Sequence, residues 1–180
     1  MQGFQITSSP IVETKAVPGN DIYLTIDTNI QMFAEQAMNK IEEGKPEWAT
    51  LAVMEAKTGK MLAVASTPSF DNNILNIKSY YDPFVSNTYE PGSTMKIFSF
   101  MAAMENGMYD GKETYKSGRL KVDDAIIKDH NGIGWGTITY DEGFYGSSNV
   151  AATNLALKLG RAKLMDFYSN LGYGKKTGIS

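Results

Sequence analysis

The stretch YEPGSTMK at positions 89–96 joins a Pro-Gly turn to the start of a helix. The residues that follow, from Ser93 to Asn106, are mostly apolar, and Gly107 ends the run. Their apolar side chains surround the helix axis instead of forming one stripe, which predicts a central, buried helix. Ser93 and Lys96 lie three positions apart and therefore share a helix face, so their hydroxyl and amine can approach one another. Free N–H groups at the helix start can also stabilise an oxyanion.

Two interpretations of Ser93 and Lys96 are open. In the structural interpretation, Ser93 is a helix N-cap and Lys96 is a solvated lysine. At average residue frequencies, the probability of a chance S-x-x-K match in a chain of this length is about one half. In the catalytic interpretation, the apolar helix desolvates Lys96 and lowers its pKa, so that its neutral amine can serve as a base for Ser93. A lysine in the first turn also opposes the helix dipole, which favours the catalytic interpretation.

A second polar group, Ser147-Ser148-Asn149, follows 54 positions after Ser93, at the junction of two expected helices. Ser and Asn favour the N-cap position, so a capping role alone would account for these residues. Close to Ser93 and Lys96, however, a hydroxyl and a carboxamide could relay a proton and hold a substrate amide.

The two groups together resemble the first two active-site motifs of the penicillin-binding proteins, S-x-x-K and S-x-N. The likeness covers roughly residues 21 to 180 and is closest to the monofunctional, class B, division-type enzymes of Gram-positive bacteria. Further segments carry it: Leu24-Thr25-Ile26-Asp27 with Gln31, the hairpin over 53–65, and Trp135-Gly136.

The resemblance implies a D,D-transpeptidase that cross-links peptidoglycan stem peptides and is acylated by β-lactam antibiotics. Ser93 would attack the carbonyl of the penultimate D-Ala and Lys96 would accept its proton. Ser147 would pass a proton to the leaving amine, and Asn149 would hold the substrate amide. Neither a cofactor nor a metal is expected. Two alternatives stay open: a β-lactamase or penicillin-sensor domain of the same clan, and a non-catalytic division scaffold.

The resemblance implies an α/β (α+β) fold, in which helices flank an antiparallel sheet. Residues 1–20 are expected to be a lead-in from a preceding domain or linker, and residues 21–180 the N-terminal part of the transpeptidase domain. Residues 23–26 have strand composition, and Asp27 fits an N-cap for the helix that follows. Residues 50–54 and 61–65 predict a hairpin whose two apolar faces should both be covered. A two-stranded sheet is marginal in water, so we expect further strands outside this chain, and an inactive chain without that C-terminal remainder.

Residues 66–89 are predicted to form a long irregular connection. The chain after about residue 90 is predicted to be mainly helical. Thr139 and Glu142 fit a capping box, and helices are expected over about 150–159 and 161–171. Lys176-Thr177-Gly178 spells the third family motif, K-T-G, but follows these helices too closely to lie on a strand. We therefore interpret it as a chance match.

Composition limits the other function classes. The 180 residues are 42% hydrophobic and carry a formal charge of −3, which offers no basic face for nucleic acid. The absence of cysteine removes thiol chemistry, and the single His130 is expected in a loop. Asp129 and Asn131 hint at a calcium loop, but Ile133 and Tyr140 occupy ligand positions, so we reject that site.

We find neither a signal peptide nor a membrane span, so an extracytoplasmic protein would be anchored through a segment outside this chain. A glycan polymerase and division proteins are the expected partners.

Overall fold

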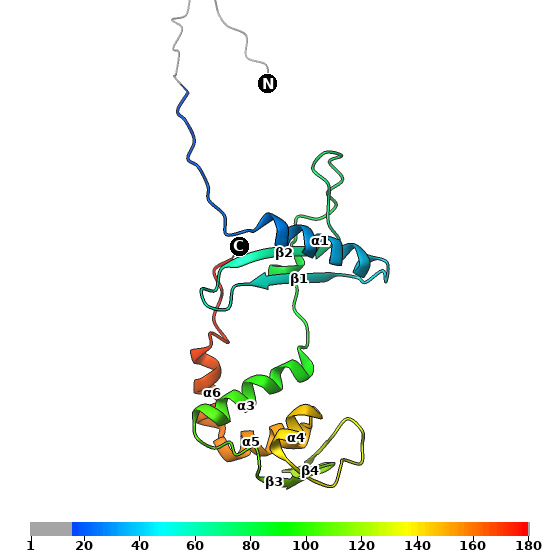
Figure 1. Cartoon of the computed structure of the whole chain (residues 1–180), viewed down its shortest axis with the longest axis vertical. Coiled ribbons are helices and arrows are strands. Elements are labelled where there is room, and N and C mark those ends of the chain that lie inside the picture. The colour runs from blue at the N-terminus through cyan, green and yellow to red at the C-terminus, as the bar shows by residue number, and fades with distance from the viewer. Residues whose placement is uncertain (1–15, 180) are drawn as a thin grey trace, which may run out of the picture. The chain divides into compact units, whose positions relative to one another are not determined.

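The computed structural model describes residues 16–179, so most of the lead-in predicted at 1–20 lies outside the described residues. The chain divides into two compact units, one up to Asn87 and one from Thr88 onward (Figure 1). The elements in chain order are α1 (Thr28–Glu42), β1 (Ala49–Met54), β2 (Met61–Thr67), α2 (Pro83–Ser86), the 3₁₀ turn η1 (Gly92–Thr94), α3 (Met95–Glu105), β3 (Thr114–Lys116), β4 (Arg119–Val122), β5 (Ala125–Lys128), β6 (Thr137–Thr139), α4 (Tyr140–Tyr145), α5 (Asn149–Leu159) and α6 (Arg161–Asn170).

The first unit packs α1 on one face of a two-stranded antiparallel sheet. The predicted N-cap of α1 is confirmed, because the Asp27 carboxylate accepts hydrogen bonds from the backbone N–H groups of Asn29 and Ile30. The predicted hairpin is also confirmed, and β1 and β2 pair along their whole length. Side chains from one sheet face and from α1 form its buried core: Ala34, Met38, Ala63 and Ala65.

One expectation for this unit is wrong within the part of the chain that the structure describes. Residues 23–26 do not form a strand, and the side chain of Tyr23 is 91% exposed. The segment still touches the sheet, because the Thr25 hydroxyl donates to the Met61 carbonyl and the N–H of the following Asp27 donates to the Leu62 carbonyl over 2.9 Å. The described residues cover the second sheet face in part, since the Ser66 hydroxyl donates to Asp82 over 3.0 Å, whereas Ala52 is exposed and Met54 is 57% exposed. A single helix can cover only one face of a hairpin.

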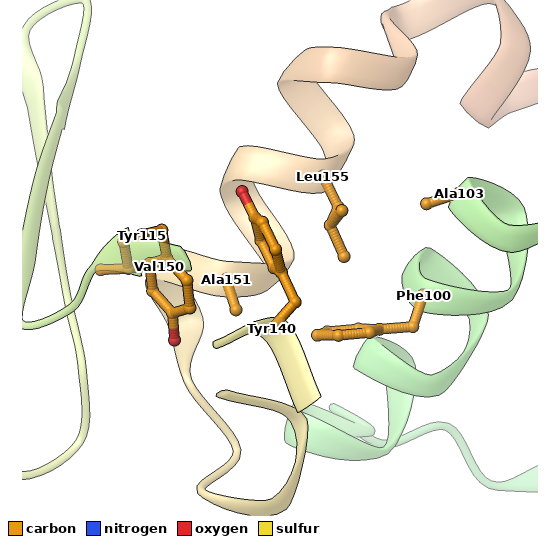
Figure 2. Close-up of a cluster of buried hydrophobic side chains, with 7 residues drawn as sticks. All are labelled: Phe100, Ala103, Tyr115, Tyr140, Val150, Ala151 and Leu155. Carbon is orange, nitrogen blue, oxygen red and sulfur yellow. The ribbon is translucent and has the colours of Figure 1, made fainter. Parts of the chain in front are cut away.

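The second unit is mainly helical and is built around α3 and α5. Figure 2 shows its core, in which side chains from both helices meet two stacked tyrosines. The rings of Tyr115 and Tyr140 lie 4.9 Å apart between centroids. The core residues are Phe100, Ala103, Tyr115, Tyr140, Val150, Ala151 and Leu155. A smaller cluster of Ala102, Leu159 and Phe167 joins α6 to the same helices.

The helix α3 differs from its prediction in two ways. It is preceded by the 3₁₀ turn η1, so Ser93 lies in this tighter turn and Lys96 in the first turn of α3. The prediction of burial all round is wrong for the described residues, because Ile97 is 47% and Met104 is 51% exposed. Phe100 and Ala103, by contrast, face the core on the other side.

The region from 112 to 136 carried no predicted elements and forms two short antiparallel pairs. β3 pairs with β6, and β4 pairs with β5. Asp129 comes directly after β5, and Gly118 comes directly before β4. The Asp129 N–H donates to the Gly118 carbonyl over 3.0 Å, at the junction between the two strand pairs. Each strand has only three or four residues, too few for the alternation of a half-buried strand to stand out in the sequence.

The later predictions are confirmed. Thr139 and Glu142 form the capping box at the start of α4. The helices α5 and α6 fall where glycine punctuation placed their ends, and Gly160 lies between them. Lys176-Thr177-Gly178 is not in a strand, as expected for a chance match to the third motif. The mixed helix and strand content agrees with the predicted fold class.

Candidate active site

The side chain of Lys96 reaches from the first turn of α3 to the turn before α5. Its Nζ lies 2.5 Å from the Ser147 carbonyl oxygen and 3.1 Å from the Ser147 hydroxyl oxygen. A lysine with these two contacts is not a solvated surface lysine. The structural interpretation of Lys96 is therefore wrong, and the first two predicted motifs meet at this point.

Ser93 lies beside Lys96 without acting as a helix cap. The residue before η1 is Pro91, and the residue before α3 is Thr94; neither turn has a side-chain cap. Ser93, Lys96 and Ser147 line one cavity of about 140 Å³. Within the described part of the chain, the Lys96 amine is hydrogen bonded to Ser147 and not to Ser93. Ser93 itself is an exposed residue that lines this cavity.

The cavity wall makes the Lys96 amine easier to deprotonate. Desolvation by burial lowers the pKa of Lys96, and the negative charge of Asp129 opposes part of this shift. Ile97, Phe100 and Phe144 supply apolar surface to the same cavity. A neutral amine has two N–H donors and one lone pair, so it can donate to the Ser147 carbonyl and still accept a proton.

Ser147 has a backbone conformation that non-glycine residues rarely adopt. Its φ is +52°, in the left-handed region. This conformation costs a non-glycine residue about 1–2 kcal/mol, so neighbouring contacts must hold it. The Ser147 N–H donates to the Phe144 carbonyl over 3.0 Å, and the Ser148 N–H donates to the Gly143 carbonyl over 2.8 Å. The tight turn directs both Ser147 oxygens toward Lys96.

The other two residues of the second motif are fixed by the end of β5. Ser148 is the N-cap of α5, accepting from the Ala151 N–H over 3.0 Å, so the capping interpretation is correct for this residue. The Asn149 side-chain Nδ2 donates to the Lys128 carbonyl over 2.7 Å. That bond leaves the side-chain oxygen Oδ1 of Asn149 as an acceptor for another group.

Asp129 is the residue of this site that the sequence did not identify. Its side chain is 2% exposed, and it accepts from the Ser148 hydroxyl over 2.8 Å and from the Val150 N–H over 3.0 Å. Burial would raise the pKa of Asp129, but hydrogen bonds from Val150, Gly118 and Ser148 outweigh it and lower that pKa. The carboxylate is therefore charged at neutral pH. The sequence offered this residue only as a rejected calcium ligand.

His130 follows in a turn, as expected for a loop histidine. Its ring lies 5.4 Å from that of Trp135. Among residues 16–179, three or more His, Cys, Asp or Glu side chains do not gather in a group that could hold a metal ion. Over the same residues, none of the helices is both long and apolar enough to span a membrane.

Comparison with known protein families shows which family this chain belongs to. Residues 49–180 match the model of the penicillin binding protein transpeptidase domain. This chain belongs to that family. The match includes both motifs and the β1–β2 hairpin, so it confirms the resemblance drawn from S-x-x-K and S-x-N.

Relatives of this penicillin-binding protein domain come from different bacteria. The stage V sporulation protein D of Bacillus subtilis is 34% identical over 89% of this chain and 26% of its own length. The probable peptidoglycan D,D-transpeptidase PenA of Neisseria gonorrhoeae is 30% identical over 87% of this chain and 27% of its own. The class B assignment is confirmed, whereas the narrower assignment to Gram-positive bacteria stays a prediction.

A solved structure supports the same fold. The penicillin-binding protein 2X of Streptococcus thermophilus superposes with a TM-score of 0.77 at 34% identity, over 89% of this chain and 25% of that one. The predicted penicillin-binding fold class is thereby confirmed. This chain spans about a quarter of the length of the relatives that it matches.

Proposed function

We propose that this chain carries the acylation residues of a serine D,D-transpeptidase that cross-links peptidoglycan stem peptides. Ser93 is the nucleophile, Lys96 its base, Ser147 the proton relay and Asn149 the residue that holds the substrate amide. The family match supports the reaction class, and the pairing of Lys96 with Ser147 beside Ser93 supports the roles. That pairing is the single observation on which the proposal rests.

The first step is attack by Ser93 Oγ on the carbonyl carbon of the penultimate D-Ala. The neutral Lys96 amine takes the hydroxyl proton as the new C–O bond forms. The free N–H groups at the start of η1 lie next to Ser93 and would stabilise the negative oxygen of the tetrahedral intermediate. The shared cavity that Ser93 and Lys96 both line supports this step.

The second step is expulsion of the terminal D-Ala. As the C–N bond breaks, the leaving nitrogen takes a proton from the Ser147 hydroxyl, and Lys96 returns its proton to that hydroxyl. The 3.1 Å between Lys96 Nζ and Ser147 Oγ fits such a relay. An acyl ester on Ser93 results. The amine of a neighbouring stem peptide then attacks it and loses one proton, which returns through Lys96 to the Ser93 oxygen as the ester C–O bond breaks, so that the cross-link forms and Ser93 is freed.

The remaining assignments belong to the same proposal. β-Lactams acylate Ser93 by the same attack, and sequence outside this chain supplies the other wall of the cleft. The β1–β2 sheet has only two strands among the described residues, and a sheet of two strands is marginal in water, which supports further strands there. The longer protein acts outside the cytoplasm, is anchored to the membrane through a segment not in this chain, and works with a glycan polymerase and division proteins. Residues 21–180 form the N-terminal part of the transpeptidase domain.

Mass spectrometry of the longer protein after incubation with a labelled penicillin tests this function. We expect one adduct, located on Ser93, and none in the Ser93→Ala variant. An adduct on another residue, or none at all, contradicts the proposal. A time course after removal of free penicillin separates the alternatives, because a β-lactamase releases the adduct quickly while a transpeptidase stays acylated. A scaffold would bind no label with either residue at position 93.

A further inference from the structure

We propose that Asp129 is a positioning residue for acylation, whose buried carboxylate holds the Ser147-Ser148-Asn149 turn against Lys96. The proposal rests on the function proposed above. Asp129 does not line the cavity, so it acts through the residues that it hydrogen bonds and through its charge, which opposes the lowering of the Lys96 pKa.

The carboxylate joins three backbone segments. Its Oδ1 accepts from the Ser148 hydroxyl and from the Val150 N–H at the start of α5. Its Oδ2 accepts from the Gly118 N–H over 2.7 Å, between β3 and β4. Hydrogen bonds to a buried charged group are stronger than those between neutral groups, and an amide in place of the carboxylate would keep one acceptor oxygen but turn an NH2 donor toward the donors that met the other oxygen.

The backbone beside Asp129 binds the same turn a second time. The Lys128 carbonyl accepts from Asn149 Nδ2, so the last residue of β5 and the residue after it hold Asn149 and Ser148. Ser147 is the next residue back along the chain, and its left-handed φ of +52° needs such support. Without it, we expect the Ser147 backbone to relax toward a common conformation, which would move its two oxygens away from Lys96.

The test is the Asp129→Asn variant of the longer protein, which keeps the size of the side chain. Stopped-flow measurement with a fluorescent penicillin gives the initial binding constant and the acylation rate constant separately. We expect acylation to slow roughly 10- to 100-fold while initial binding changes little, because a displaced relay group affects the chemical step. The matched control is Asp124→Asn, an exposed aspartate on the same β4–β5 hairpin, which we expect to leave both constants unchanged.

A purely structural role predicts a different result. Asp129→Asn would then lower the melting temperature but leave the acylation rate constant of the folded protein unchanged, and that outcome overturns the proposal. If Asp129→Asn does not fold, Ser148→Ala decides, since it keeps the Asp129 charge and removes the hydroxyl that links Asp129 to the turn and caps α5. A Ser148→Ala protein that acylates at the normal rate also overturns it. An unsubstituted protein without a Ser93 adduct would instead refute the proposed function, so the two failures are distinguishable.

Discussion

The amine of Lys96 lies 2.5 Å from the carbonyl oxygen of Ser147, although 51 positions separate the two residues in the chain. This contact joins the helix that carries Ser93 to the turn that carries Asn149. It places the desolvated Lys96 amine next to the Ser147 hydroxyl. The proposed nucleophile, Ser93, lines the same cavity as these two residues. Both proton transfers proposed for acylation pass through this pair.

Replacing Lys96 with methionine is expected to slow acylation by about 100- to 10,000-fold, because the base is lost while an unbranched side chain of similar length fills its space. Labelling of the longer protein with a fluorescent penicillin measures the rate. Lys121→Met, at an exposed position on β4, is the control and should acylate normally. Rapid labelling of the Lys96→Met protein would exclude Lys96 as the base.

Acylation is expected to accelerate as pH rises, with an apparent pKa below the ordinary 10.5 of a lysine. Burial lowers the pKa of Lys96, so the reactive neutral amine appears at a lower pH than in a solvated lysine. A profile of acylation rate against pH measures this. A rate that still follows the titration of an ordinary lysine would show that the amine is not desolvated.

The same pKa shift makes stability depend on pH. The unfolded chain keeps the Lys96 proton up to about 10.5, whereas the folded chain releases it earlier, so between the two pKa values the unfolded state binds more protons. The free energy of unfolding should therefore rise with pH across that interval. Urea midpoints measured over the interval should show this slope in the unsubstituted protein and a weaker one in Lys96→Met.

Ser147→Gly and Ser147→Ala form a matched pair. Both lack the relay hydroxyl, so both should acylate slowly. Only glycine adopts a φ of +52° without strain, and we expect the glycine variant to be more stable than the alanine variant by about 1 kcal/mol. Thermal melts and labelling rates measure the two effects separately. Equal stability of the two variants would contradict the left-handed conformation of this residue.

Gly143→Ala is expected to lower the free energy of unfolding by about 1–3 kcal/mol. A Cβ atom at Gly143 would collide with the Tyr115 hydroxyl, which is packed against the stacked Tyr140 ring. Because Gly143 also lines the cavity and accepts from the Ser148 N–H, labelling should slow as well. Urea unfolding measures the loss. The control is Gly19→Ala, because a Cβ at Gly19 would lie in open space and the change should be neutral. Gly107→Ala is not an equivalent control, since the φ of +66° at Gly107 adds backbone strain.

Local patterns were sufficient for several elements. The Asp27 cap, the hairpin turn and the Thr139 capping box depend on residues only a few positions apart, and each formed as predicted. The strand predicted at 23–26 failed because a strand requires a partner, and strand composition does not indicate whether one is present. Burial of α3 was overestimated for a related reason, since apolar composition does not specify which neighbours cover it.

The sequence by itself determined the family, because Ser93 with Lys96 and Ser147 with Asn149 keep fixed short spacings that composition alone rarely produces together. Only the tertiary structure decided that Lys96 bonds to Ser147 and not to Ser93, and that Asp129 supports the turn. Those contacts join α3, the end of β5 and the start of α5, which are distant in the chain. Their geometry follows from how the helices and short strands pack around Tyr115 and Tyr140, and no short-range periodicity encodes it.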